Sequence, residues 1–397
     1  MLHKKKSTGM KVAVAAGGRF HALHLAHQLE CHGALAALFT ASFRPSDKKY
    51  VTSGVHGVLR LQLVEDLIMR FRLLKLIDKS RWYVWKDNWF DRWLARQISQ
   101  LGHVDIFVGW AHYILHSIPA IRSTGAKIVL ESGSCHILEQ EKLLCEEYAH
   151  FGLKSAPIHP RNRDKMLREY EQADYIMTPS RFVYDSFLRQ GVPAAKLLQV
   201  PYGVDAARFY VPRAELAHKF RVLFVGQLSL QKGVSYLLDA WQSLNLPHSE
   251  AELVLVGNID PALARLLAKK KLPVNIIFHG SVPQEALNEQ YARASLFVLP
   301  SIQEGLAMVQ AEAMAAGLPL LATTNTGAAE LIDDGREGFI VPIRNAAALA
   351  EKIAWSFQHR DVCFAMGMRA QEKIKQFSWD CYGDKIMQTY QRILEQA

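Results

Sequence analysis

The most informative part of the sequence is Pro300-Ser-Ile-Gln-Glu-Gly-Leu-Ala-Met-Val-Gln-Ala-Glu-Ala-Met-Ala-Ala-Gly-Leu-Pro319. A buried strand is expected to end at its first proline, and a turn that carries Glu304 and Gly305 follows. A helix is expected to start close to Leu306 and to end at Gly317, where glycine stops a helix and the second proline prevents its resumption. The stretch therefore predicts a strand, a turn and a helix, which is the unit of an alternating α/β domain.

The start of this predicted helix suits a phosphorylated ligand. Free backbone N–H groups and the positive end of the macrodipole bind phosphate oxygens there without a charged side chain. Glu304 lies on the turn and Glu312 lies inside the helix, so the two carboxylates can accept hydrogen bonds from vicinal hydroxyls of a sugar or ribose. The alternative is structural, with Glu304 capping the helix and Glu312 in solvent.

A second stretch with the same character is Leu223-Phe-Val-Gly-Gln-Leu-Ser-Leu-Gln-Lys-Gly233. A strand is expected to end at Gly226, and a short loop with Lys232 leads into a helix. Lys232 can point at a phosphate near that helix start, although the spacing is not that of the known phosphate loops. The alternative is an exposed loop lysine.

Short apolar runs that predict buried parallel strands recur along the chain. They occupy residues 11–16, 105–109, 127–130, 174–178, 221–226, 253–257, 275–280, 295–300 and 318–323. Helical patterns separate them, and turn residues between 201 and 212 place a domain boundary near 208–220. We therefore expect an α/β chain of two Rossmann-like doubly wound domains in tandem, with ligands in the cleft between them at the carboxyl ends of the strands.

The charge is uneven between the two halves. Residues 1–210 carry 29 Lys and Arg against 19 Asp and Glu, a net charge of +10, while residues 211–397 carry 18 against 19, a net charge of −1. A basic first half predicts an anionic partner on that side. The five cysteines are odd in number and include no C-x-x-C pair, so a reduced compartment fits better than a secreted one and a cysteine zinc site is not expected. No run approaches the ~18 apolar residues of a transmembrane helix.

Several further motifs accompany the two stretches. In the second half they are Val225-Gly226, Lys232-Gly233, Gly257, Glu304 and Glu312 with seven residues between them, Gly317-Leu-Pro319, Thr326-Gly-Ala-Ala-Glu330 and Gly335-Arg-Glu-Gly-Phe339. In the first half they are Gly17-Gly18, Ala173-Asp-Tyr175, Pro179-Ser-Arg-Phe182 and Val200-Pro-Tyr-Gly-Val-Asp205. With these motifs the chain resembles the retaining glycosyltransferases of family 4, or group 1, which have the GT-B fold.

The residue patterns predict the lead-in and the domain boundary, and the resemblance implies the roles of the two domains and the returning last helix. Residues 1–9 would form a disordered lead-in, residues 10–212 an acceptor-side Rossmann-like domain, and residues 213–376 a Rossmann-like domain that binds the nucleotide sugar. Residues 377–397 would form a helix that crosses back to the N-terminal domain.

The resemblance also implies the roles of individual residues. Lys232 would contact the donor diphosphate, Glu312 the ribose hydroxyls and Glu304 the donor sugar. The amides of Gly305, Leu306 and Ala307 would bind phosphate and sugar oxygens. Gly17 and Gly18 would let the N-terminal backbone approach the diphosphate. Neither a metal nor a cofactor is expected, because helix dipoles and basic side chains neutralise the diphosphate.

One position departs from the family pattern. The family usually has arginine directly after the glycine that ends the strand at Gly226, and this sequence has Gln227. Glutamine can donate a hydrogen bond to the phosphates but brings no charge. Arg19 is a candidate replacement, and its alternative is a solvated arginine at a helix start.

Histidines give two further candidates. The family often places a histidine after the strand at 127–130, which makes His136 the candidate for contact with the donor sugar, or otherwise a structural residue. His21, His24 and His27 recur every three residues, a spacing that can present metal ligands. Since no paired carboxylate completes such a site, the helix surface or the acceptor cleft is the expected place for them.

The segment Arg81-Trp-Tyr-Val-Trp-Lys-Asp-Asn-Trp-Phe-Asp-Arg-Trp93 holds four of the eight tryptophans. Residues 60–96 carry nine Lys and Arg against five Asp and Glu. Tryptophan with basic residues on a helix suits an anionic membrane surface or a lipid-linked acceptor. The alternative is a helix whose tryptophans pack on the core. Nucleic acid is not an expected partner, because no known nucleic-acid-binding module is present.

Taken together, these features predict a cytoplasmic, metal-independent hexosyltransferase, peripheral at the inner face of the membrane. It would move a hexose-type sugar, with retention, from a nucleotide-diphosphate sugar to a hydroxyl of a glycan or lipid-linked glycan in cell-surface polysaccharide synthesis. The alternatives are a GT-B sugar-nucleotide epimerase, which uses the same donors, and a non-catalytic sugar-nucleotide-binding partner subunit, suggested by Gln227. A dinucleotide dehydrogenase is poorly supported, because the first glycine-rich turn lacks G-x-G-x-x-G.

Overall fold

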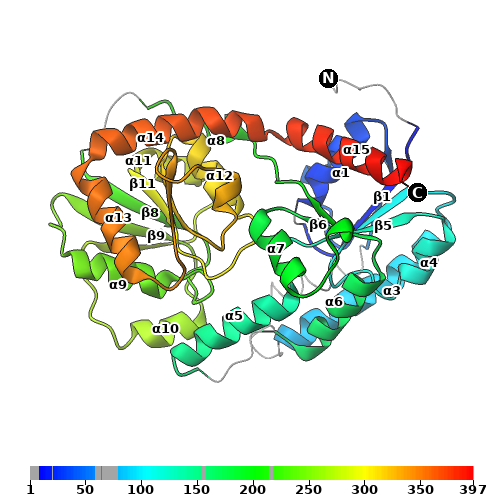
Figure 1. The fold of residues 1–397 in the computed structure, drawn as a ribbon, viewed down its shortest axis with the longest axis horizontal. Coiled ribbons are helices and arrows are strands. Elements are labelled where there is room, and N and C mark those ends of the chain that lie inside the picture. The colour runs from blue at the N-terminus through cyan, green and yellow to red at the C-terminus, as the bar shows by residue number, and fades with distance from the viewer. Residues whose placement is uncertain are drawn as a thin grey trace.

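The computed structural model describes residues 9–19, 21–58, 64, 79–153, 158–213 and 218–396. The predicted lead-in at 1–9 lies outside these residues except for Gly9, as do residue 20 and most of the basic segment between 59 and 78. Figure 1 shows two α/β domains, each with its own sheet, joined along one side by the helices at the C-terminal end of the chain.

The N-terminal sheet is parallel throughout, with strand order β3-β2-β1-β4-β5-β6-β7. Its strands are β1 (Val12–Ala16), β2 (Leu35–Thr40), β3 (Val55–Gly57), β4 (Ile106–Trp110), β5 (Lys127–Glu131), β6 (Tyr175–Thr178) and β7 (Leu197–Gln199). The connecting helices are α1 (Ala22–Cys31), η1 (Pro45–Lys49), α3 (Lys79–Ile98), α4 (Ile118–Ser123), α5 (Ile137–His150), α6 (Pro160–Gln172), α7 (Arg181–Arg189), η3 (Ala194–Lys196) and α8 (Ala206–Phe209).

The C-terminal sheet repeats the same construction, with strand order β10-β9-β8-β11-β12-β13 and only parallel pairs among them. Its strands are β8 (Phe220–Val225), β9 (Ala251–Val256), β10 (Ile276–Gly280), β11 (Leu296–Leu299), β12 (Leu320–Thr323) and β13 (Gly338–Val341). Its helices are α9 (Val234–Leu244), α10 (Pro261–Leu267), η4 (Gln284–Ala286), α11 (Leu287–Arg293), α12 (Met308–Ala315), η5 (Ala328–Glu330) and α13 (Ala346–Gln358).

The central strands are apolar on both faces, because helices cover both sides of a parallel sheet. Every residue of β1, β4, β9 and β11 is buried. The nine strands predicted from apolar runs are all present, each within two residues of its predicted ends. The α/β GT-B class is therefore confirmed, and the predicted boundary at 212/213 falls between the last strand of one sheet and the first strand of the other.

The end of the chain returns to the N-terminal domain through α14 (Arg360–Lys373), η6 (Ile374–Phe377) and α15 (Trp379–Glu395). In Figure 1 this run extends across both domains. α15 packs against α1: the Trp379 ring stacks on His24 with centroids 3.9 Å apart, and Gln28 donates a hydrogen bond of 3.0 Å to Asp380. Burial is the main reason why the pKa of His24 falls to about 4, so this imidazole is neutral at pH 7.

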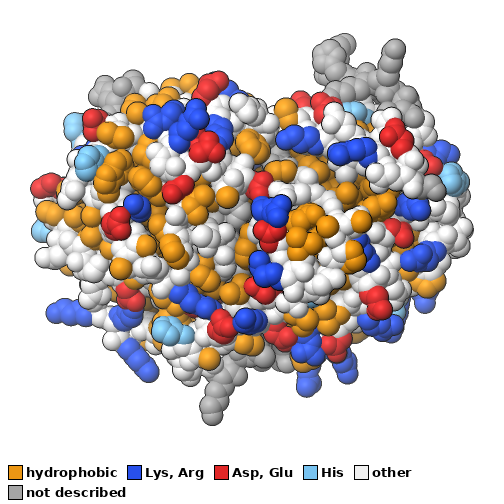
Figure 2. All heavy atoms as spheres, in the orientation of Figure 1, with side chains coloured by type: hydrophobic (Ala, Val, Ile, Leu, Met, Phe, Trp, Pro, Cys, Tyr) orange, Lys and Arg blue, Asp and Glu red, His pale blue; other side chains and the backbone are white. Residues whose placement is uncertain are grey.

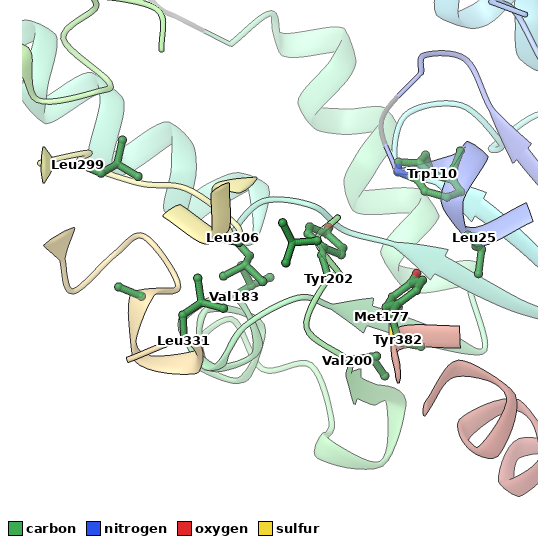
Figure 3. Close-up of a cluster of buried hydrophobic side chains, with 14 of the residues drawn as sticks. Leu25, Trp110, Met177, Val183, Val200, Tyr202, Leu299, Leu306, Leu331 and Tyr382 are labelled. Atoms are coloured by element: carbon green, nitrogen blue, oxygen red, sulfur yellow. The ribbon is translucent and has the colours of Figure 1, made fainter. Parts of the chain in front are cut away.

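One apolar core runs through both domains. Figure 3 shows part of it, with Leu299, Leu306 and Leu331 from the C-terminal domain and Val183 and Tyr202 from the N-terminal domain. On the surface seen in Figure 2, Lys and Arg side chains alternate with Asp and Glu side chains over both domains. Beneath this charged surface, the two domains meet through the buried apolar side chains of the shared core.

Candidate active site between the two domains

Two of the predicted site residues lie together at the carboxyl edge of the C-terminal sheet. Lys232 follows β8 and Glu304 follows β11, and these strands are neighbours in the sheet. The Lys232 ammonium donates a short hydrogen bond to Glu304 Oε1 in an ion pair whose side chains are only 23% and 15% exposed. The structure therefore places a cation and an anion side by side where the sequence predicted contacts to the diphosphate and the sugar.

The turn after β11 touches the N-terminal domain directly. A Cβ atom at position 305 would lie 1.9 Å from the carbonyl oxygen of Gly133, so only glycine fits at Gly305. Ser180 Oγ donates a 2.6 Å hydrogen bond to the Gly305 carbonyl, and Ser134 Oγ donates one of 2.9 Å to the side chain of Gln303. The two domains are in contact at the turn that carries Glu304.

Glu312 lies inside α12 and is nearly buried. Its carboxylate accepts a hydrogen bond of 2.9 Å from the hydroxyl of Tyr291, on α11. Burial raises the pKa of Glu312, and the Tyr291 hydroxyl and the charge of Arg208 oppose that rise. The solvated alternative for Glu312 is therefore excluded, while its contact with ribose stays a prediction.

The remaining C-terminal candidates lie around the same edge. Leu306 is buried, and Ala307 is the N-cap residue of α12, which begins at Met308. Gln227 is exposed just beyond β8. Gly233 has φ +65°, and a Cβ there would lie 1.9 Å from the carbonyl oxygen of Pro300, so the loop that carries Lys232 packs directly on the end of β11.

The glycine pair of the N-terminal domain has a packing role that the sequence did not reveal. A Cβ at Gly17 would lie 2.1 Å from the ring of Tyr113, so the missing side chain makes room for this tyrosine. Gly18 is half-buried beside it. Arg19 is engaged in a 2.5 Å ion pair with Asp47, which follows Pro45 in η1. Arg19 is nevertheless exposed, as the solvated alternative expects, and its contact with the diphosphate stays a prediction.

His136 occupies the N-cap of α5. Its Nδ1 accepts a hydrogen bond of 3.3 Å from the Leu138 amide, and its ring packs against Tyr170 and Phe187 with centroids 4.9 and 5.0 Å away. Burial lowers the pKa of His136 to about 4. This position corresponds to the structural alternative, and the predicted contact with the donor sugar stays a prediction.

A cavity of about 430 Å³ opens beside the contact between Gly133 and Gly305, at the carboxyl ends of β1, β4, β5 and β7. It is lined by His21, Trp110, Ala111, His112, Glu131, Ser132, Gly133, Ser134, Gln140, Met166, Tyr202 and Met308. All of these except Met308, at the start of α12, belong to the N-terminal domain. The arrangement is that of a ligand site shared by two doubly wound domains.

The buried side chain of Glu169 holds the cavity wall that follows β4. Glu169 accepts hydrogen bonds from the backbone amides of Ile114 at 2.9 Å and Leu115 at 3.0 Å, and also from the amide of His112. Its complete burial raises its pKa to about 7, although Lys165 and the backbone donors oppose this. The loop adopts a left-handed φ of +65° at His112, which a non-glycine residue rarely does. The sequence does not reveal these hydrogen bonds, because Glu169 and the amides that donate to it lie more than fifty positions apart.

The three spaced histidines separate in the structure. His21 lines the cavity, His24 stacks on Trp379, and His27 Nδ1 lies 2.6 Å from the carbonyl oxygen of Tyr50. A carboxylate does lie beside one of them, since His21 Nε2 is 3.4 Å from Glu131 Oε2. Within the described ranges, no group of three or more His, Cys, Asp or Glu side chains is arranged to hold a metal ion.

Comparison with known proteins agrees with this geometry. Residues 15–208 match the family described as glycosyltransferase family 4, and residues 219–359 match the glycosyl transferases group 1. The two matches together span most of the chain and meet at the boundary between the two sheets. The chain belongs to the group 1, family 4 glycosyltransferases.

Three similar proteins illustrate the family. The GDP-mannose-dependent alpha-(1-6)-phosphatidylinositol monomannoside mannosyltransferase of Mycobacterium tuberculosis is 29% identical over 312 residues, 74% of this chain and 77% of that protein. The D-inositol 3-phosphate glycosyltransferase of Corynebacterium jeikeium is 23% identical over 96% of this chain and 92% of its own. The crystal structure of Anabaena Alr3699/HepE in complex with UDP has a TM-score of 0.69 at 16% identity, covering 96% of this chain and 100% of that one.

The chain is therefore a glycosyltransferase with a nucleotide sugar as donor, and the epimerase and binding-subunit alternatives are not favoured. In the part of the chain that the structure describes, no helix is both long and apolar enough to cross a membrane.

Proposed function

We propose that the chain transfers a hexose-type sugar, with retention, from a nucleoside-diphosphate sugar to a hydroxyl of a glycan or lipid-linked glycan. The Lys232–Glu304 ion pair carries this proposal, because it lies at the strand edge that faces the other domain and next to Gly305. An anionic diphosphate would take Glu304's place beside the Lys232 ammonium. Glu304 would then be free to accept hydrogen bonds from hydroxyls of the donor sugar.

The chemistry needs one bond to form and one to break. The bond between the sugar's anomeric carbon and the diphosphate oxygen breaks, the acceptor oxygen bonds to that carbon on the same face, and its proton passes to a phosphate oxygen. Lys232 and the α12 amides would stabilise the charge that develops on the leaving diphosphate. Contact of Gly305 with Gly133 would keep water away from the oxocarbenium-like sugar. Glu312 would bind the ribose, and no metal or cofactor would be required.

The names of the relatives suit this substrate class. One relative uses GDP-mannose and a phosphatidylinositol mannoside, another an inositol phosphate, and the solved structure holds UDP. These names support a nucleoside diphosphate as the leaving group, with an acceptor that is polyhydroxylated or lipid-linked. We place the enzyme in cell-surface polysaccharide synthesis, in the cytoplasm, with no role for nucleic acid.

The outer face of α3 supports attachment to an anionic membrane. Trp89 and Trp93 pack on the core, as the structural alternative proposed, but Tyr83 is 45% and Trp85 is 50% exposed. A cavity of about 570 Å³ between α3 and the start of α6 is lined by Arg81, Val84, Trp85, Asn88, Trp89, Arg92, His159 and Arg161. Arginine beside exposed tryptophan suits phosphate headgroups at a membrane interface. We propose that this groove holds the enzyme at the inner membrane face.

The donor can be identified by thermal denaturation. With UDP, GDP, ADP and their sugars added separately, we expect one nucleotide to raise the melting temperature, because a ligand that binds only the folded state stabilises it. The sugar nucleotide with that base should then release free nucleoside diphosphate when acceptor is present. If no nucleotide stabilises the protein and none of the sugar nucleotides is consumed, the proposed function is wrong.

Membrane attachment can be measured by pelleting the protein with liposomes. We expect binding to phosphatidylglycerol-containing vesicles and not to pure phosphatidylcholine. The triple variant Arg81→Gln, Arg92→Gln, Arg161→Gln should weaken binding roughly a hundredfold, at about 1 kcal/mol for each basic residue. A control variant, Lys269→Gln, Lys271→Gln, removes two positive charges from the C-terminal domain and should bind as the wild type does. Equal binding of the triple variant would contradict the proposal.

A further inference from the structure

We propose that Glu131, paired with His21, is the acceptor-recognition group and receives hydrogen bonds from ring hydroxyls of a neutral, unphosphorylated sugar or cyclic polyol. This inference rests on the proposed transferase function and names the part of the acceptor that enters the cavity. Glu131 ends β5 and His21 follows β1, so the fold brings together two side chains that are 110 positions apart in the sequence.

The first observation concerns the burial and the hydrogen bonding of the Glu131 carboxylate. The residue is 1% exposed and lines the cavity, yet neither of its oxygens has a hydrogen-bond partner among the described residues. His21 Nε2, 3.4 Å away, likewise lacks a hydrogen bond within the described chain. Leaving a buried polar group without hydrogen bonds destabilises the folded protein, and a buried charged group destabilises it more. Donors on a bound ligand would remove this destabilisation.

The walls beside the pair are aromatic. The His21 ring packs against Trp110 and against Tyr202, with ring centroids 4.9 and 4.0 Å away. The buried Tyr202 hydroxyl also lacks a partner among the described residues, and burial, with the charge of Glu131, raises its pKa, so it stays protonated and can donate. Aromatic faces beside a carboxylate and a hydroxyl match the alternating C–H and O–H groups of a sugar or cyclitol ring.

The charge of the cavity excludes a phosphate at this point. Its lining, as far as the structure describes it, contains a carboxylate, two histidines and polar or apolar side chains, but no Lys or Arg. A phosphate beside the buried Glu131 carboxylate would meet like-charge repulsion in a low-dielectric environment. A hydroxyl donates to the same oxygens at no such cost.

The test separates acceptor recognition from donor use. Myo-inositol and methyl α-D-mannopyranoside serve as neutral probes, and myo-inositol 1-phosphate and mannose 6-phosphate as anionic ones. Binding of each probe to the protein saturated with the preferred nucleoside diphosphate is followed by saturation-transfer NMR and calorimetry. Acceptor-dependent diphosphate release is measured in parallel, with slow hydrolysis of the donor alone as the internal reference.

We expect the wild type to bind a neutral probe more tightly than its phosphorylated counterpart. Glu131→Gln should weaken that binding about tenfold to a hundredfold, as loss of a hydrogen bond to a charged group does. Its affinity for the nucleotide should stay near that of the wild type, and any fall in donor hydrolysis should be much smaller than the fall in probe binding. Tyr202→Phe, which breaks no hydrogen bond within the described protein, should weaken probe binding several-fold without affecting folding. Glu252→Gln serves as the control, since Glu252 is a buried carboxylate on β9 paired with Arg221, away from the cavity lining.

Three results would overturn the inference while leaving the transferase function intact. They are unchanged probe binding in both Glu131→Gln and Tyr202→Phe, preference for the phosphorylated probes, and a fall in nucleotide affinity or donor hydrolysis equal to the fall in probe binding. The last would place the donor sugar in the cavity. Failure of the wild type to bind any nucleoside diphosphate would instead contradict the proposed function.

Discussion

Lys232→Met should lower kcat/KM by at least about a hundredfold, as removal of one preorganised donor for a developing negative charge does. The side chain is nearly isosteric with lysine, so the loop between β8 and α9 should keep its shape, while the cation beside Glu304 is lost. Gln227 stands where the family usually has arginine and carries no charge. It therefore would not replace the cation that the diphosphate loses with Lys232. Steady-state kinetics with the preferred donor would measure the effect, and most of it should fall on kcat.

Lys270→Met is the matched control for this prediction. Lys270 also forms a short ion pair, with Asp239, but both residues lie on the surface of the C-terminal domain. Its kinetics should equal those of the wild type. Glu304→Gln should lose as much activity as Lys232→Met, and the double variant should lose less than the sum, because the two side chains stabilise the same transition state and act as a unit. Normal turnover by either single variant would contradict the site assignment.

Gly305→Ala should abolish most turnover while leaving both domains folded. The new Cβ would lie 1.9 Å from the Gly133 carbonyl oxygen and 3.3 Å from Pro179, so the domains must separate to admit it. A displacement of about 1 Å at a reacting centre can cost about a hundredfold in rate. We expect nucleotide affinity near that of the wild type, because the donor would still bind the C-terminal domain, and a larger radius of gyration in small-angle scattering.

Gly57→Ala provides the comparison for Gly305→Ala. A Cβ at Gly57 meets no atom within 4 Å, and this glycine, on an edge strand, has no left-handed φ, so kinetics and scattering should not change. Turnover by Gly305→Ala at the wild-type rate would show that contact between the two turns is not needed for catalysis.

Much of the fold follows from local sequence. Arg221-Val-Leu-Phe-Val-Gly226 predicted β8 and the restart of the α/β pattern, because an apolar run that ends in glycine indicates a buried strand and its turn. Short strands were missed. β7 (Leu197–Gln199) has three residues, too few for a pattern. β13 (Gly338–Val341) was not predicted although it is as long as β6, β11 and β12, and its place is defined by pairing with β12. β2 (Leu35–Thr40) was missed although it is apolar, because it continues directly from the turn that ends α1.

The candidate site was predictable where a motif is contiguous. Glu304, Gly305 and Glu312 lie within one strand–turn–helix unit, and Lys232 lies in the next unit across the sheet. The pairing of His21 with Glu131 depends on the neighbouring positions of β1, β4 and β5, so no short motif contains it. The role of Gly17 was likewise hidden, since Tyr113, the ring that requires the glycine, arrives from the loop after β4. Long-range pairs of this kind are set by topology.

The return of α15 to the N-terminal domain has a consequence for synthesis of the chain. Tyr382, Ile386 and Tyr390 of α15 are buried in the shared core, and α15 covers α1. Domains generally fold as they emerge from the ribosome, the first one first. Here the order is inverted at the last step: the second domain can form while the first still lacks one of its helices. The N-terminal domain is therefore complete only once α15 has been synthesised, and a chain that stops before residue 378 exposes its apolar surface.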